Sequence, residues 1–343
     1  MVKIAYYVHT WNRRGTPLSL SRIISELNSD EFEAWVLYDE QKDNPLILEL
    51  FKHAHFASYY RSKSVDSLGY PTESDIERVI MKTVKPDILH VARSGRTEWP
   101  LVKRYASLQI ENNIFGGMDR SGFIDRTVCP NKYVSSRRGE CDAIIPHPIP
   151  VIVGNPIEVL HKCDIPNGAL VCGRVGRTGW FHPWAFDAFK AIQERNENLY
   201  FLLCSPCEEA VAYVERNHIQ NVRYIDPINN DITLYNFYAA CDIFLHYCSG
   251  GETFSNCILE AMMCGCPVIS HISGNDDGHI ETMGDTGMIA HNAEEYREFL
   301  SSLVKDRTIR LIAGARARER ARTYFAQSTV VREYERYYKE WLK

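Results

Sequence analysis

Two carboxylates stand around a predicted helix start in the stretch GGETFSNCILEAMMCGCPVIS, residues 250–270. Glu252 precedes the predicted helix, and Glu260 lies inside it. A helix N-terminus attracts phosphate through its amides and dipole, whereas a carboxylate accepts hydrogen bonds from hydroxyls. Because carboxylates suit vicinal diols and repel bare phosphate, the pattern indicates a ligand that joins a sugar to a nucleoside diphosphate. Two solvated glutamates around a core helix are the alternative explanation.

The residue types around this helix predict where it begins and ends. Thr253, Ser255 and Asn256 are N-capping types, so the helix is expected to start after Phe254. Gly265 suits a left-handed helix end, and a proline two residues later prevents continuation. The apolar runs CDIFLHYC before it and PVISH after it predict strands. In doubly wound sheets ligands bind beyond the carboxyl ends of strands, which is where this stretch would lie.

Strand and helix patterns alternate in both halves of the 343-residue chain. One series begins with KIAYYVH and a helix after Gly15, and a second begins with GALVCGR after a proline-rich run at 146–156. The pattern predicts an α/β protein with two Rossmann-like, doubly wound parallel-sheet domains facing a cleft. Their expected ranges are 1–150 and 151–325, and the amphipathic helix at 326–343 is expected to dock back on the first domain.

Composition excludes several classes of protein. The net charge of −5 argues against a nucleic-acid binder, and the near-neutral first half is compatible only with weak peripheral membrane contact. No signal segment or long apolar run is found, so a cytoplasmic location is expected. Eleven cysteines without regular spacing indicate reduced thiols. The pair Cys204 and Cys207 is better explained by strand-end thiols than by a zinc or redox motif.

Two groups of arginines are candidates for contacts with anions. Arg174 ends the strand VCGR, where it would form either a surface ion pair or a phosphate contact. Arg316, Arg318, Arg320 and Arg322 alternate in GARARERART. That spacing spreads the charges around a helix, which favours a solvated face over an anionic partner.

The stretch at 250–270 resembles the signature of the retaining glycosyltransferases of family 4, in group 1, which have the two-domain GT-B fold. The matching residues are Glu252, Glu260, Ala261, Met262, Gly265, Pro267, Val268 and Ile269. The segments VCGRVGR, CDIFLHYCSGGETF and HIETMGDTGMIAHNAEEYREFL also resemble the family pattern. The resemblance covers most of the chain and is strongest from about Leu170 to Phe325.

The resemblance implies that 151–325 is the donor domain and 1–150 the acceptor-side domain. Glu260 would bind the ribose, Glu252 the transferred sugar and Arg174 the diphosphate. Arg177 would act as a second catalytic cation where the family usually has a lysine. The other implied donor-binding residues are Gly15, Thr253, Phe254 and Ser255.

The candidates for contact with the acceptor come from the first domain. His9 and His90 end predicted strands, and for both residues packing is an equal alternative. Asn112 lies in IENNIFGG, where many relatives carry a histidine.

The implied activity is that of a retaining hexosyltransferase-type enzyme of glycan biosynthesis that needs neither a metal nor another cofactor. Its donor would be a UDP-, GDP- or ADP-sugar, and its acceptor a glycan, a lipid-linked molecule or a small molecule. A catalytically weak or inactive nucleotide-sugar binding protein is the alternative, because the usual lysine is missing. A nicotinamide-dependent oxidoreductase is disfavoured, since the loop after the first strand has a single glycine.

Overall fold

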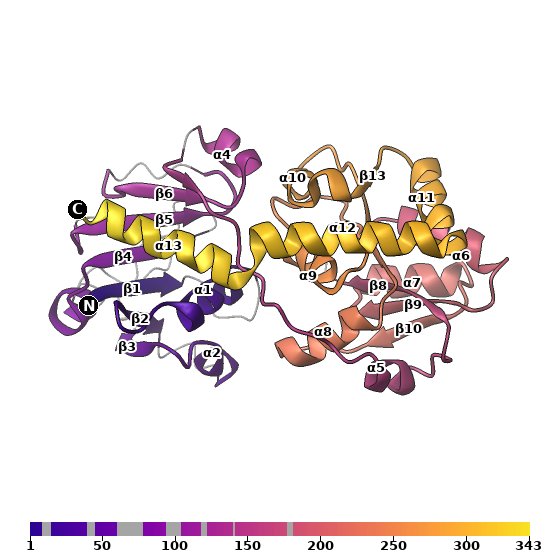
Figure 1. The fold of residues 1–343 in the computed structure, drawn as a ribbon, viewed down its shortest axis with the longest axis horizontal. Coiled ribbons are helices and arrows are strands. Elements are labelled where there is room, and N and C mark those ends of the chain that lie inside the picture. The colour runs from indigo at the N-terminus through magenta and orange to yellow at the C-terminus, as the bar shows by residue number, and fades with distance from the viewer. Residues whose placement is uncertain are drawn as a thin grey trace. The chain divides into compact units, whose positions relative to one another are not determined.

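The computed structural model describes residues 1–8, 15–39, 45–59, 78–93, 104–117, 122–139, 141–176 and 181–343. The chain divides into two compact units, one formed by Met1–Pro150 with Ala326–Lys343 and the other by Val151–Phe325 (Figure 1). Each unit is built on its own parallel sheet. The predicted α/β class with two doubly wound sheets is confirmed.

The sheet of the first unit has the strand order β3-β2-β1-β4-β5-β6-β7. Neighbouring strands run parallel, with pairs such as Ile4 opposite Ala34 on one side and Ile88 on the other. The strands are β1 (Val2–Val8), β2 (Phe32–Asp39), β3 (His55–Tyr59), β4 (Ile88–Arg93), β5 (Leu108–Asn113), β6 (Arg126–Cys129) and β7 (Ala143–Ile144).

Alternate side chains of β1 enter two different cores, because successive strand residues point to opposite faces. Ile4 and Tyr6 pack with α1 (Gly15–Glu26) and α13 (Gln327–Trp341). Ala5 and Tyr7 pack on the other face with a π-helical segment, Arg78–Val84. Two short helices, α2 (Pro45–Leu50) and α4 (Lys132–Arg138), complete the described helices of this unit.

The last helix of the chain belongs to the first unit. Val330, Tyr334 and Tyr338 of α13 are buried against the sheet and α1. A parallel bridge between Ile149 and Ala326 fixes the point where the chain returns to this unit. The apolar stripe seen in the sequence of α13 therefore covers one face of the first sheet.

The sheet of the second unit has the order β10-β9-β8-β11-β12-β13, again with parallel neighbours. Counted from β8, this is the 3-2-1-4-5-6 order of nucleotide-binding doubly wound sheets. The strands are β8 (Leu170–Val175), β9 (Leu199–Cys204), β10 (Val222–Ile225), β11 (Ile243–Leu245), β12 (Val268–His271) and β13 (Met288–Ala290).

Helices also cover the second sheet. The core on one face joins β8, β9 and β11 to α6 (Trp184–Gln193), α7 (Glu208–Arg216) and α11 (Ala293–Lys305). α9 (Asn256–Cys264) packs between α8 (Asp231–Ala239) and α12 (Arg307–Phe325). The remaining segments are α5 (Ile157–Lys162), α10 (Gly278–Met283) and a 3-10 turn, Gly284–Thr286. None of the eleven cysteines, which all lie in the described ranges, forms a disulfide.

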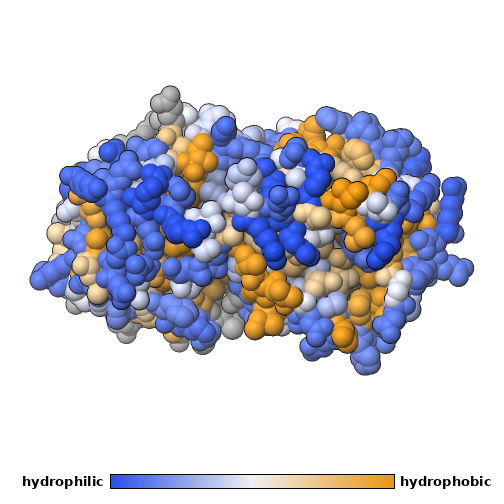
Figure 2. Space-filling view, in the orientation of Figure 1, coloured by the Kyte–Doolittle hydropathy of each residue, from blue (hydrophilic) through white to orange (hydrophobic). Residues whose placement is uncertain are grey.

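The two halves of α12 differ in surface character. Figure 2 shows apolar side chains near its start, where Ile309 and Ile312 are exposed, and strongly hydrophilic ones along its arginine-rich half. Arg316, Arg318 and Arg322 of that half are exposed, as a solvated face predicts, and Arg320 is half-buried. Three of these four arginines also bind the backbone or a carboxylate. Arg318 donates to the Cys264 carbonyl at the end of α9, and the other two are Arg316 (to Asp285) and Arg320 (to Glu281 and Thr282). These arginines neutralise carbonyl groups at helix ends.

No helix in the described ranges is both long enough and apolar enough to cross a membrane.

Candidate active site

The residues predicted to bind a ligand in the second unit lie at one edge of its sheet. Arg174 is next to last in β8, and residues 246–255 connect β11 to α9. β8 and β11 are the neighbouring strands at which the strand order changes direction. Ligands of doubly wound sheets bind beyond the carboxyl ends of the strands at such a switch point. The topology therefore brings Arg174 and Glu252 to the place where a ligand is expected.

Two residues of the connecting loop have a left-handed backbone. Gly251 has φ 71°, and a Cβ there would overlap the Asp276 carbonyl, so glycine is required. Ser255, the N-cap of α9, has φ 72°, which costs a residue with a side chain about 1–3 kcal/mol. Within the described residues its hydroxyl makes no capping bond to α9 and lies 3.4 Å from Cys257 Sγ. The N-terminus of α9 is therefore not closed by its own N-cap side chain.

The loop that carries Glu252 is held by the connection that follows β12. The His279 amide donates to the Glu252 carbonyl oxygen at 3.0 Å. The Cys248 amide donates to Nε2 of His271 at 3.2 Å, and Gly251 forms a parallel bridge with Asp276. These bonds fix the backbone on both sides of Glu252.

Arg174 is buried, with 2% of its surface exposed. Its Nη2 donates to the Tyr247 carbonyl at 2.8 Å, its Nη1 donates to Cys257 Sγ at 3.2 Å, and its guanidinium lies over the Tyr247 ring. Among the described residues its Nε has no hydrogen-bond partner and the guanidinium forms no ion pair. An unpaired buried charge is unfavourable, so an anionic ligand would stabilise this arrangement.

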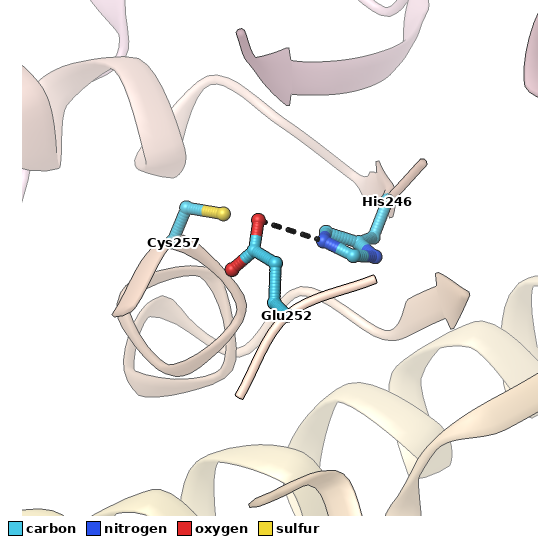
Figure 3. Close-up of side chains that lie close together, drawn as sticks. All are labelled: His246, Glu252 and Cys257. Atoms are coloured by element: carbon cyan, nitrogen blue, oxygen red, sulfur yellow. Dashed lines mark hydrogen bonds and ion pairs between the residues drawn. The ribbon is translucent and has the colours of Figure 1, made fainter. Parts of the chain in front are cut away.

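Glu252 belongs to a chain of three side chains. His246 Nδ1 lies 2.7 Å from the Ser270 hydroxyl, and its Nε2 lies 3.4 Å from Oε1 of Glu252 (Figure 3). Burial lowers the pKa of His246 to about 3, so the imidazole is neutral at neutral pH. Burial alone would raise the pKa of Glu252, but His246, Arg174 and Ser255 together lower it to about 2. Glu252 is therefore an ionised carboxylate oriented by a neutral histidine.

Cys257 completes this group on the α9 side (Figure 3). Its Sγ, Nε2 of His246 and an oxygen of Glu252 lie within 4.8 Å of one another. Within the described ranges, these three residues form a set that could hold a metal ion.

Glu260 lies deeper in α9 and is 4% exposed. The Tyr238 hydroxyl on α8 donates to its Oε2 at 3.0 Å. Burial, followed by the charge of Glu260, raises the pKa of Tyr238 well above its usual value, so the phenol keeps its proton and remains a donor. Tyr238 thereby orients the Glu260 carboxylate.

Thr253 and Phe254 are buried residues between Glu252 and α9. The Phe254 carbonyl accepts a hydrogen bond from the Thr282 hydroxyl at 2.8 Å, and its ring packs against Phe325. The side chain of Phe254 therefore packs, which leaves its backbone as the part that could serve a ligand. Donor binding by Thr253 and Phe254 stays a prediction.

The remaining predicted site residues belong to the first unit or lie outside the described residues. Gly15 is the exposed first residue of α1, with open space where a Cβ would lie. His9 and Arg177 lie outside the described residues.

His90 and Asn112 are buried beneath α13 in the first unit. His90 Nδ1 lies 2.7 Å from the Tyr338 hydroxyl, and Asn112 Nδ2 donates to the Tyr334 hydroxyl at 3.2 Å. α13 covers both side chains, so these contacts support the packing role left open for His90. Acceptor contact by either residue stays a prediction.

The sequence pattern does not predict His246, Ser270 and Cys257 as site residues. His246 and Ser270 stand inside the apolar runs CDIFLHYC and PVISH, where a single polar residue resembles core. The available signal was their position at the carboxyl ends of neighbouring strands, where side chains face a ligand.

Comparisons with known proteins concern the family and the fold of the chain. Residues 167–306 match the model of a family described as glycosyl transferases group 1. No curated protein matches the sequence. The structure of Alr3699/HepE from Anabaena in complex with UDP and glucose is similar along 99% of this chain and 100% of that chain, with 13% identity and a TM-score of 0.73.

Two further solved structures are similar over nearly their whole length. A glycosyltransferase from Rickettsia africae is 15% identical over 100% of this chain and 99% of its own, with a TM-score of 0.73. Sucrose-phosphate synthase from Thermosynechococcus elongatus is 13% identical over 99% of both chains, with a TM-score of 0.71. With its two parallel sheets and its match over 167–306, the protein has the two-domain GT-B fold of these glycosyltransferases.

Proposed function

We propose that the protein is a glycosyltransferase that moves a hexosyl group from a nucleoside diphosphate sugar to an acceptor hydroxyl. The transfer retains the anomeric configuration and uses no metal ion. The observation that carries this proposal is Arg174, a buried cation at the switch point that has no ion-pair partner among the described residues and lies beside the start of α9. A diphosphate bound there would supply the missing counter-charge and would lie at a helix N-terminus.

The carboxylates then divide the donor between them. Glu252, ionised and held by His246, accepts hydrogen bonds from hydroxyls of the transferred sugar. Glu260, held by Tyr238, accepts them from the ribose. Backbone amides of residues 253–255 bind the diphosphate between them. The family resemblance supports each of these assignments.

In the proposed reaction the bond between the sugar and the leaving phosphate breaks on the face where the acceptor enters. Negative charge develops on the leaving phosphate oxygen, and Arg174 neutralises it, with Arg177 as the second cation. The same oxygen takes the proton of the acceptor hydroxyl as the new glycosidic bond forms. The protein contributes positioning and charge stabilisation and needs no separate general base.

The donor and the acceptor are proposed as classes. The Anabaena structure contains UDP and glucose, which makes UDP-sugars the first donors to test, before GDP- and ADP-sugars. The acceptor is a glycan, a lipid-linked molecule or a small molecule that offers a hydroxyl.

The test is calorimetric titration of the folded protein with each donor class, followed by assay of donor hydrolysis and transfer. We expect Glu260→Ala to weaken nucleoside diphosphate binding, and Glu252→Ala mainly to lower transfer. Glu319→Ala, an exposed site on α12, is the matched control. Absence of binding to every donor would contradict the proposal, and equal effects of the first two variants on UDP affinity would refute the division of roles. Binding without turnover would favour the non-catalytic alternative.

A further inference from the structure

The three side chains drawn in Figure 3 offer different donor atoms from different elements. His246 follows β11, Glu252 lies in the loop and Cys257 is the second residue of α9. The proposed transfer uses only Glu252 among them as a sugar contact. A nitrogen, an oxygen and a sulfur that converge beside the donor site call for a separate explanation.

We propose that His246, Glu252 and Cys257 form an inhibitory site for a thiophilic divalent cation of the zinc class. The cation would bind Nε2, a carboxylate oxygen and Sγ, and would exclude the nucleotide-sugar. This goes beyond the proposed transfer, which needs no metal. The exclusion, but not the metal binding, rests on the proposed function.

The spacing of the ligand atoms supports the site. Zinc–nitrogen and zinc–oxygen bonds of about 2.0–2.2 Å at a tetrahedral angle place the two ligand atoms about 3.4 Å apart. His246 Nε2 and Glu252 Oε1 are 3.4 Å apart. All three ligand atoms lie within 4.8 Å, so Sγ needs to approach by only about 1 Å to complete a three-ligand site.

His246 is already oriented as a ligand. Without a cation Nε2 carries the imidazole proton that faces Glu252. In the other tautomer Nδ1 donates to the Ser270 hydroxyl, 2.7 Å away, and Nε2 becomes able to bind a cation. Such outer partners fix the ring orientation of metal-ligating histidines. Because His246 is buried, its ring has little freedom to turn away.

The mixture of donor atoms determines the class of cation. Imidazole, thiolate and carboxylate together suit zinc or cobalt, whereas magnesium and calcium prefer oxygen ligands alone. Three protein ligands leave a fourth position for water. Glu252 and Cys257 are both half-buried, so this position can reach solvent.

Arg174 has two opposing effects on such a cation. Its Nη1 donates to Cys257 Sγ and its charge favours the thiolate, but burial outweighs this charge and raises the pKa of Cys257 to about 11. A cation therefore has to displace the thiol proton when it binds. Its charge also repels a cation, which favours binding of modest affinity. Once bound, the metal would occupy the Glu252 oxygen that the sugar hydroxyls need, and inhibition follows from that shared atom.

The experiment uses the full chain and Co²⁺, because cobalt reports its own coordination in the absorption spectrum. We expect one Co²⁺ per chain, a thiolate-to-cobalt charge-transfer band, and displacement of the cobalt by Zn²⁺. Cys257→Ser should abolish the band and weaken binding at least about a hundredfold, and Ser270→Ala should weaken it about tenfold. Cys264→Ser at the other end of α9 and the exposed His291→Gln should leave the band unchanged.

Each outcome decides one part of the proposal. A band that survives Cys257→Ser, or disappears with Cys264→Ser, overturns the site, as does stoichiometric binding of no cobalt at all. Titration of UDP-sugar into protein with and without Zn²⁺ tests the exclusion, and unchanged donor affinity overturns it. If no donor binds even without metal, the proposed transfer fails while the spectra still decide the metal site.

Discussion

Each unit buries a histidine at the fourth strand of its 3-2-1-4 arrangement, on β4 in the first unit and directly after β11 in the second. The two histidines differ in what their Nε2 atom meets. His90 of β4 and His246 after β11 both place Nδ1 2.7 Å from a hydroxyl, that of Tyr338 or Ser270. Among the described residues Nε2 of His90 has no hydrogen-bond partner, whereas Nε2 of His246 lies 3.4 Å from Glu252. In the first unit the histidine is enclosed in the core, whereas in the second unit its Nε2 faces the ionised carboxylate of Glu252.

This difference comes from what covers each strand end. In the first unit α13 covers His90, so the histidine and its tyrosines form part of a core. In the second unit a loop with two left-handed residues leaves the Glu252 side chain 20% exposed. A buried histidine therefore indicates function only when its free nitrogen meets a group that solvent or ligand can reach.

The largest expected effect is on the rate of sugar transfer, and it distinguishes the buried Arg174 of the second unit from the buried Arg22 of the first. Arg174→Ala should lower the rate of sugar transfer about a hundredfold, about 3 kcal/mol, because the leaving diphosphate loses its cation. Arg22→Ala removes a buried arginine that donates to the Pro148 carbonyl in the first unit, and should lower stability while donor affinity stays unchanged. Steady-state kinetics and calorimetry measure both, and equal loss of donor affinity in the two variants would break the distinction.

The stability of the protein at acid pH tests whether both buried histidines have a lowered pKa. Burial lowers the pKa of His90 and His246 from 6.5 to about 3. Below pH 6.5 both imidazoles become protonated in the unfolded protein, whereas in the folded protein they stay neutral down to about pH 3. The free energy of unfolding should therefore fall by about 1.4 kcal/mol per pH unit for each histidine in this window.

His90→Phe removes one of these contributions from the first unit. The loss of unfolding free energy between pH 7 and pH 5, measured by urea denaturation, should then be smaller by about 2 kcal/mol than in the unaltered protein. The exposed His53→Gln serves as control. An acid sensitivity that is identical in all three proteins would show that His90 is protonated in the folded state.

The smallest effect distinguishes a positioning histidine from a packing one. His246→Gln should lower kcat/KM for the sugar donor about tenfold, near the value of one hydrogen bond to a charged group, because Glu252 loses the neighbour that orients it. UDP alone, which carries no sugar, should bind as before. His90→Gln should destabilise the protein and leave kcat/KM unchanged. Loss of UDP affinity in His246→Gln would instead indicate a structural role.

Much of the fold could be predicted from local pattern. Apolar runs such as LYFLLC coincide with β9 (Leu199–Cys204), and the end of α9 falls at Gly265, whose φ is 84°. These elements are determined by hydrophobic periodicity and backbone preference, which act over a few residues. The parallel direction of the strands follows from the alternation of strands and helices, since parallel neighbours need crossover connections. The order of the strands comes from the structure alone.

The partners of the site residues were less predictable. Thr253, Ser255 and Asn256 were all recognised as capping types, yet the N-cap Ser255 adopts a left-handed backbone and leaves α9 without a side-chain cap among the described residues. The spacing of the arginines on α12 predicts a solvated face, but it does not show that Arg318 and Arg320 also bind carbonyl groups of helices far away in sequence. Contacts of this kind depend on packing, which residue types alone do not specify.

By itself the sequence determined the class of fold and the positions of Glu252, Glu260 and Arg174 near a helix start, because strand periodicity and helix signals are local. Only the tertiary structure decided that Arg174 is buried without an ion-pair partner in the described ranges, and that His246 and Cys257 converge on Glu252. Burial and convergence arise when separate strands and helices pack together, and their energies depend on that three-dimensional neighbourhood.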